Sequence, residues 1–186
     1  MTIFRLRCRK ILLVVSLCFA VSCTQTSNNS HKEIPTGNDS CESIPVSEYL
    51  DLGLSSGTLW SNQNEINKAD PKYNFFTYDE ALALFGDKLP TKRQWEELKK
   101  ECQWEWIGKG YNITGPNGNS ITLPADGYGG CDGSVYNVGS FGNYWSSTPY
   151  ESDYAWYLII DWCGIGINCK IWCDGSSVRL TTLPGR

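Results

Sequence analysis

The cysteines are the side chains best suited to chemistry in this chain, which has nine cysteines but a single histidine among 186 residues. Cys163, Cys169 and Cys173 lie close together near the C-terminus, and thiolates bind zinc or copper. Their spacing contains no C-x-x-C pair and offers only three ligands. The histidine, His31, falls in a polar N-terminal segment. The pattern therefore predicts no metal site and no histidine-based catalytic triad in the domain.

The carboxylates form the second set of candidates for chemistry. Asp126 and Asp132 flank a glycine-rich turn, and Asp153 and Asp161 lie near aromatic residues. Two carboxylates can act as acid and base when their pKa values are driven apart, but nothing in the sequence indicates such a difference. Turn formation and solubility explain these residues. Because the chain also has no P-loop and no dinucleotide-binding glycine motif, we predict no cofactor and no catalytic residue.

The aromatic residues between positions 143 and 175 indicate binding. They mix with Ser, Gly, Asp and Asn, which combines rigid contact area with adaptable hydrogen-bonding groups, as in an antibody combining site. Aromatic rings also suit a surface on which sugars stack. The predicted partner is an unidentified protein or glycan. The candidate ligand-binding residues are Tyr150, Asp153, Tyr154, Tyr157, Asp161, Trp162, Asn168, Lys170 and Trp172.

The N-terminus has the parts of a bacterial export signal. A basic stretch comes first, residues 11–21 are apolar, and small residues then precede a cysteine. The sequence Ala20-Val21-Ser22-Cys23 resembles a lipobox, which implies cleavage before Cys23 and lipidation of that residue. An ordinary signal peptide cut nearby is the alternative. We therefore predict a protein held by lipid to a membrane of the cell envelope, with the outer membrane favoured.

The composition changes after this signal and divides the chain. Residues 1–22 form the predicted signal peptide, 23–45 a flexible polar tether, and 46–186 one domain. Cleavage removes four of the sixteen basic residues and none of the twenty acidic ones, so the formal net charge changes from −4 to −8. No basic stripe remains, and no nucleic-acid partner is predicted.

Export also changes the expected state of the cysteines. Cys8 and Cys18 leave with the signal and Cys23 takes the lipid, so six cysteines remain. An even number in an oxidising compartment permits up to three disulfides. We predict at least one pair within residues 163–173, where it would bridge a hairpin.

Two helices and a series of short strands must position these residues. Thr91 and Gln94 form a capping box at the start of a helix over residues 88–100, and Thr77 and Glu80 form another before a first helix. From Gly110 onward, alternating stretches separated by glycine turns are typical of strands. This order predicts an α+β domain in which two helices pack on a small, mainly antiparallel β-sheet with long loops.

Several motifs resemble those of one known family. LPTKRQWEEL (Leu89–Leu98), GNYWSST (Gly142–Thr148) and SVRL (Ser177–Leu180) are similar to motifs of the Fibrobacter succinogenes major paralogous domain family. DLGLSSGTLW at 51–60 and GPNGNSITLPADGY at 115–128 add to the resemblance, and the order also agrees. The family belongs with the formylglycine-generating enzyme in the C-type-lectin-like fold. The resemblance implies that fold here and places Trp145 in its core.

The resemblance leaves the function open, because one fold hosts many functions. Some lectin-like bacterial proteins are diversified by retroelements, and IIDWCGIGINCKIWCDG (Ile159–Gly175) lies between motifs that resemble fixed flanks. Drift within a large paralogous family is the alternative. A cysteine or copper oxidase like the formylglycine-generating enzyme and a structural envelope protein are two further hypotheses. We expect a non-catalytic ligand-binding protein.

Overall fold

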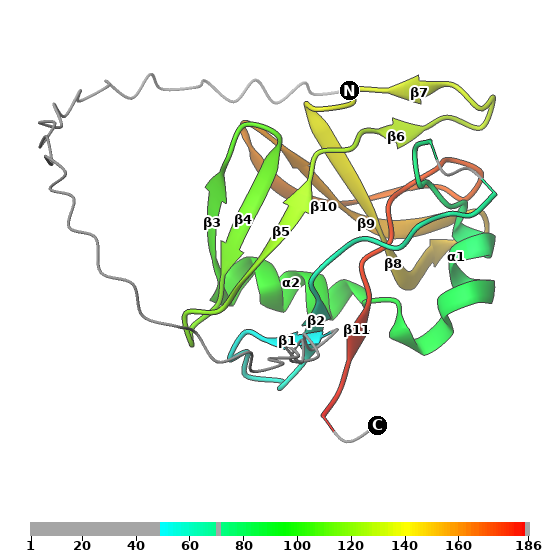
Figure 1. Cartoon of the computed structure of the whole chain (residues 1–186). Coiled ribbons are helices and arrows are strands. Elements are labelled where there is room, and N and C mark those ends of the chain that lie inside the picture. The colour runs from blue at the N-terminus through cyan, green and yellow to red at the C-terminus, as the bar shows by residue number, and fades with distance from the viewer. Residues whose placement is uncertain (1–48, 70–71, 185–186) are drawn as a thin grey trace, which may run out of the picture. The chain divides into compact units, whose positions relative to one another are not determined.

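The computed structural model describes residues 49–69 and 72–184. The predicted signal peptide, Cys23 and the tether lie outside these residues. The described chain begins with a pair of short strands, continues through two helices and ends in a series of antiparallel strands (Figure 1). It is therefore α+β, as the sequence predicted. Within the described residues, no helix combines the length and the apolar character needed to cross a membrane.

Both helices begin at the capping boxes that the sequence predicted. The Thr77 hydroxyl accepts a hydrogen bond from the Glu80 amide, and the Glu80 carboxylate accepts one from the Thr77 amide. Thr91 and Gln94 make the same reciprocal pair. These bonds satisfy amides that a helix start otherwise leaves without partners. The helical elements are α1 (Tyr78–Phe85), the 3₁₀ turn η1 (Gly86–Lys88) and α2 (Lys92–Glu101).

The strands form several small antiparallel sheets in place of the single sheet that we expected. Most strands are short, and glycines with positive φ, such as Gly118 (88°) and Gly127 (89°), turn the chain between them. The sheets contain β1 (Tyr49–Asp51), β2 (Leu59–Ser61) and β11 (Thr181–Thr182); β3 (Gln103–Trp106), β4 (Gly110–Thr114) and β5 (Ser120–Pro124); β6 (Tyr128–Gly129) and β7 (Val135–Tyr136); and β8 (Phe141–Glu151), β9 (Tyr154–Asp161) and β10 (Gly164–Ile171).

The sheet of β8, β9 and β10 has a hydrophobic cluster on each face. Its central strand is β9, and α2 packs against the sheet while α1 lies against β8 (Figure 1). Leu158 and Ile160 enter the cluster that contains Trp95, whereas Tyr157 enters the cluster that contains Trp145. This alternation is the period of a strand. Trp145 is fully buried, as the family resemblance implied.

The motif residues are joined to one another inside the domain. Trp95 Nε1 donates to the Trp145 carbonyl at 3.2 Å, and Trp145 Nε1 donates to the Phe76 carbonyl at 2.8 Å. These bonds connect α2, β8 and the segment that leads into α1. Each satisfies a buried indole N–H, which would otherwise destabilise the fold by about 1–3 kcal/mol.

Arg179 joins the end of β2 and the loop after it to β5. It is 1% exposed, and its guanidinium donates to Asn64 Oδ1 (3.0 Å), the Ser61 carbonyl (2.9 Å) and the Thr122 carbonyl (2.7 Å). Burial lowers the pKa of Arg179 to about 10, although the nearby Tyr144 opposes this shift. Arg179 therefore remains charged at neutral pH and joins its own segment to residues 61–64 and to β5.

Candidate functional site

A pocket of about 240 Å³ opens on the face of the β8–β10 sheet that carries Tyr157 and Lys170. The strand register creates it. Asn143 lies opposite Ile159 and Tyr157 opposite Asn168, so one alternating set of side chains from three strands shares this face. We name it the Lys170 pocket. It is lined by Tyr128, Asn137, Phe141, Asn143, Tyr157, Ile159, Lys170 and Asp174.

Lys170 is a buried cation surrounded by aromatic rings. Its side chain is 8% exposed, and Nζ lies 5.0 Å from the ring centre of Tyr128 and 5.4 Å from those of Trp145 and Tyr157. A cation within about 6 Å of an aromatic face is attracted to it. The rings therefore offset part of the cost of removing this ammonium group from water.

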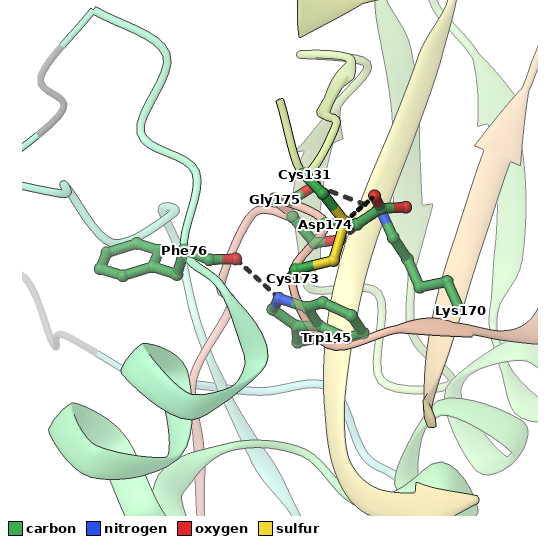
Figure 2. A network of polar contacts seen from close by, with 8 residues as sticks. Phe76, Cys131, Trp145, Lys170, Cys173, Asp174 and Gly175 are labelled. Carbon is green, nitrogen blue, oxygen red and sulfur yellow. Dashed lines mark hydrogen bonds and ion pairs between the residues drawn. A yellow bond between two sulfur atoms is a disulfide. The ribbon is translucent and has the colours of Figure 1, made fainter. Parts of the chain in front are cut away.

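The polar partners of Lys170 come from the turn that follows β10. Nζ lies 3.4 Å from Asp174 Oδ2 and donates to the Gly175 carbonyl and the Ser176 hydroxyl, both at 3.3 Å (Figure 2). These contacts are longer than the ~2.7–2.9 Å of a strong charge-assisted hydrogen bond. Burial lowers the pKa of Lys170 to about 8, and Asp174 opposes the shift. The ammonium group is thus neutralised by Asp174 but held loosely.

Asn143 contributes the most unusual atom of the Lys170 pocket. The residue is 3% exposed, and its Oδ1 has no hydrogen-bond partner. Of the four buried side-chain atoms without a partner in the described residues, it is the one that belongs to the pocket wall. Such atoms are rare, because leaving a buried acceptor unpaired costs about 1–3 kcal/mol. Asn143 lies in GNYWSST, a motif that resembles fixed framework, so the sequence did not predict it as a binding residue.

A disulfide between Cys131 and Cys173 lies beside Asp174, one of the residues that line the Lys170 pocket (Figure 2). Beside it, Gly129 and Gly175 exchange two backbone hydrogen bonds of 3.1 and 2.9 Å. The chain around β6 is therefore attached to the turn that carries Asp174. The two sulfurs and the Asp174 carboxylate lie within 4.8 Å of one another, but the sulfurs are bonded to each other and do not act as metal ligands in this state.

Our prediction of a disulfide within residues 163–173 was wrong. Cys163 lies in the β9–β10 turn and Cys169 lies toward the other end of β10, and a strand rises about 3.3 Å per residue, which separates them by about 20 Å. Both carry thiols. Cys173 lies beyond β10, where the Gly129–Gly175 pairing brings it beside Cys131. The three C-terminal cysteines therefore do not meet at one site.

The nine predicted ligand-binding residues do not form one cluster. Tyr157 and Lys170 line the Lys170 pocket. Asn168 lies on the same face but is exposed, and its side-chain oxygen accepts a hydrogen bond from the next amide at 2.8 Å. Trp172 packs against Tyr78, with ring centres 5.2 Å apart, and does not line the pocket.

The remaining five predicted residues lie at the two ends of the β8–β10 sheet. Tyr150, Asp153 and Tyr154 are exposed around the β8–β9 turn. Asp161 and Trp162 lie at the β9–β10 turn, where the Asp161 carboxylate accepts hydrogen bonds from two backbone amides at 2.7 and 3.0 Å. The pocket residues that the prediction missed are Tyr128, Asn137, Phe141, Asn143, Ile159 and Asp174.

A second hollow, of about 500 Å³, lies beside α2 but has a structural explanation. Its carboxylates are already occupied: Glu97 accepts hydrogen bonds from the Ser56 amide and hydroxyl, and Glu101 accepts them from Ser55. These bonds attach the turn between β1 and β2 to the helix. The hollow therefore results from a contact that builds the fold.

Comparison with protein-family models, curated proteins and solved structures returned no match to this chain. The geometry of the Lys170 pocket is the basis for assigning a function. The pocket combines an unpaired acceptor, a neutralised ion pair and aromatic walls. Groups of this kind bind and orient a ligand, because a few well-placed polar atoms on an apolar wall give specificity.

Proposed function

We propose that this protein is a non-catalytic ligand-binding protein of the bacterial cell envelope, held to the membrane by lipid on Cys23. Its ligand binds in the Lys170 pocket. The observation that carries the proposal is the Asn143 Oδ1 atom, which is buried in the pocket wall without a partner. A ligand that donates a hydrogen bond to this atom recovers the cost of burying it, whereas no contact within the described protein does so.

We also propose that the domain has a C-type-lectin-like fold. The motifs that resemble the Fibrobacter succinogenes major paralogous domain family supply Trp95, Trp145 and Arg179, all of which are buried. The hydrogen bonds of the two tryptophans connect α2, β8 and the segment before α1, and those of Arg179 connect β2 to β5, which supports the proposal. An experimental structure that failed to superpose on C-type-lectin-like domains would contradict it.

Alanine substitutions in the mature full-length protein test the site. The protein is first screened against defined proteins, peptides and glycans, and each ligand found is then measured with the variants. Tyr157→Ala and Lys170→Ala should remove binding. Tyr154→Ala is the matched control, since Tyr154 is on the same strand but lies at its exposed end. Equal effects of Tyr154→Ala and Tyr157→Ala, or no effect of either pocket variant, would reject the site.

Metabolic labelling with a fatty-acid analogue tests the anchor. The proposal requires label on the wild-type protein and none on a Cys23→Ser variant, which should also be lost from the membrane fraction. Label on both proteins, or on neither, would contradict attachment through Cys23.

Sequencing tests whether the binding face is diversified. The segment Ile159–Gly175 contributes Ile159, Lys170 and Asp174 to the pocket. Diversification by a retroelement requires substitutions confined to codons 143–175 in a growing population, with a template copy and a reverse transcriptase near the gene. An invariant 3′ end would leave the ligand-binding proposal standing but would remove diversification from it.

A further inference from the structure

A third hollow lies at the β9–β10 turn and borders the Lys170 pocket. This turn hollow has a volume of about 250 Å³ and shares Ile159 with the pocket. Gly166, which lines the turn hollow, lies opposite Ile159 on the neighbouring strand and has no side chain there. A Cβ atom at this position would lie 3.2 Å from Ile159 Cγ2. The turn hollow is lined by Ile159, Asp161, Cys163, Gly164, Ile165 and Gly166.

The two adjacent hollows lie along β9 and β10 with Ile159 lining both, and we name them together the groove. The strand β10 runs from Gly164 to Ile171 and spans about 20–25 Å at ~3.3 Å per residue. An occupant of the whole groove is therefore a chain of several linked units, one of which enters the Lys170 pocket. A single compact molecule would fill only one of the two hollows.

The charge of the groove favours a neutral occupant. The ammonium group of Lys170 is already neutralised by Asp174 at 3.4 Å. The other charged group of the groove is the Asp161 carboxylate, which already accepts hydrogen bonds from the Cys163 and Gly164 amides. An anion would have to approach the Asp174 carboxylate, and a cation would have to approach the ammonium group. Burying either without a partner is costly.

The hydrogen-bonding groups of the groove favour hydroxyls. Asn143 Oδ1 needs a donor, and the phenol groups of Tyr128 and Tyr157 make no hydrogen bond within the described residues. A hydroxyl can donate to Asn143 and accept from a phenol at the same time. Phe141 and Ile159 supply an apolar wall against which the C–H faces of a sugar ring pack.

A peptide suits this surface less well. The groove lies on the face of the sheet, where side chains project and the backbone groups of β9 are paired with β8 and β10. A peptide lying across that face would find few backbone partners for its own N–H and C=O groups. A sugar chain has no such backbone to satisfy.

We propose that the groove binds a neutral oligosaccharide, with one sugar residue in the Lys170 pocket and a hydroxyl of that residue donating to Asn143 Oδ1. The inference rests on the proposed function and names its ligand class. It assigns Asn143 as the residue that selects for a hydroxyl, and it assigns Gly166 as the position that keeps the groove open to the next sugar.

A glycan array followed by titration calorimetry tests the proposal with the mature full-length protein. We expect a neutral oligosaccharide to bind the wild-type protein. Asn143→Leu should lower the affinity by about tenfold or more, since one hydrogen bond to a buried group is lost. Asn112→Leu is the matched control, because Asn112 is on β4, outside both hollows. Urea unfolding of each variant checks that it is folded.

Deoxy sugars identify the hydroxyl concerned. Removing the hydroxyl that donates to Asn143 should weaken binding to the wild-type protein about tenfold but should leave binding to Asn143→Leu nearly unchanged. Gly166→Val should weaken binding of the oligosaccharide more than binding of the monosaccharide. If every deoxy sugar lost affinity equally in both proteins, the assigned contact would be wrong.

The possible results distinguish a failure of the oligosaccharide proposal from a failure of the proposed binding function. If neutral glycans fail to bind but a protein, peptide or charged ligand binds and is lost in Tyr157→Ala, the pocket functions in binding and the oligosaccharide proposal is overturned. If no ligand of any class is affected by Asn143→Leu, Tyr157→Ala or Lys170→Ala, both proposals fall.

Discussion

Lys170 and Arg179 are the two buried basic side chains of the described chain, and they are held in different ways. Arg179 makes three hydrogen bonds of 2.7–3.0 Å to oxygens of two segments that lie far away in the sequence, residues 61–64 and β5. Lys170 has contacts of 3.3–3.4 Å, all from the turn directly after its own strand, and it faces a cavity. The difference indicates a structural role for Arg179 and a ligand-directed role for Lys170.

Each cation also has an asparagine close by, and the two asparagines differ in the same way. Asn64 Oδ1 accepts from Arg179, and its amide group donates to Asp126 and Tyr144. Asn143 Oδ1 has no partner in the Lys170 pocket. A buried network in which every group is satisfied makes a fold rigid and specific. A network with one open position is suited to completion by a ligand.

Arg179→Met should give the largest loss of stability. It removes three hydrogen bonds and leaves the Ser61 and Thr122 carbonyls without this donor. We expect the free energy of unfolding to fall by about 3–5 kcal/mol, the usual cost of breaking a buried charge network. Urea unfolding measures it, with Lys170→Met as the matched control. Equal losses in the two variants would remove the distinction between the two cations.

Removing the disulfide should have the next largest effect. The bond closes a loop with a sequence separation of 42 between Cys131 and Cys173. A loop of that size predicts a loss of about 2–4 kcal/mol through the greater entropy of the unfolded chain. The double variant Cys131→Ser/Cys173→Ser, measured by thermal unfolding with and without a reductant, tests this. Reductant should lower the melting temperature of the wild-type protein but leave that of the variant unchanged.

Features that depend on residues close together in the chain can be predicted from the sequence. The capped starts of α1 and α2 depend on pairs three residues apart, Thr77 with Glu80 and Thr91 with Gln94, so they were predicted correctly. The buried position of Trp145 followed from its motif. Lys170 was predicted to bind ligand because its segment is rich in aromatic residues. The rings that surround its ammonium group include that of Tyr128, which lies far away in the sequence.

The features that sequence reasoning missed depend on contacts between distant segments. The Cys131–Cys173 pairing follows from the bridge between Gly129 and Gly175, which no local pattern encodes. The unpaired state of Asn143 depends on the register of β8 against β9 and on the absence of a donor near its side chain. A short hydrophobic run predicts a strand but does not fix its partner or its register.

Stability at alkaline pH should separate the two cations further. The pKa of Lys170 is lowered from 10.5 to about 8 by burial, so between these values the unfolded state binds a proton that the folded state has released. Stability contributed by this group therefore rises with pH across that window, by on the order of 1–2 kcal/mol between pH 8 and 10. Asp174, Tyr128 and Tyr157 are the groups that face the amine.

The difference between wild type and Lys170→Met, measured by urea unfolding at several pH values, isolates this contribution. The pKa of Cys102 is raised to about 11, which makes stability fall over part of the same range, but Cys102 is present in both proteins and cancels. A difference that did not change from pH 7 to pH 10 would show that Lys170 is not held in the environment described.

The smallest effect on stability should come from Asn143→Leu, and comparing it with Asn64→Leu is the sharpest test of the difference between the two sites. Asn64→Leu removes the acceptor of Arg179 and should lower the free energy of unfolding by about 1–3 kcal/mol. Asn143→Leu removes an acceptor that has no partner, so stability should stay the same or rise by up to about 1 kcal/mol while ligand binding weakens by about tenfold or more. Urea unfolding and calorimetric binding on the same two proteins measure both quantities. A residue that destabilises the free protein but stabilises the complex has a role in binding. If Asn143→Leu instead lowered the free energy of unfolding as much as Asn64→Leu, Asn143 would be part of the fold. The Lys170 pocket would then lose its main evidence as a binding site.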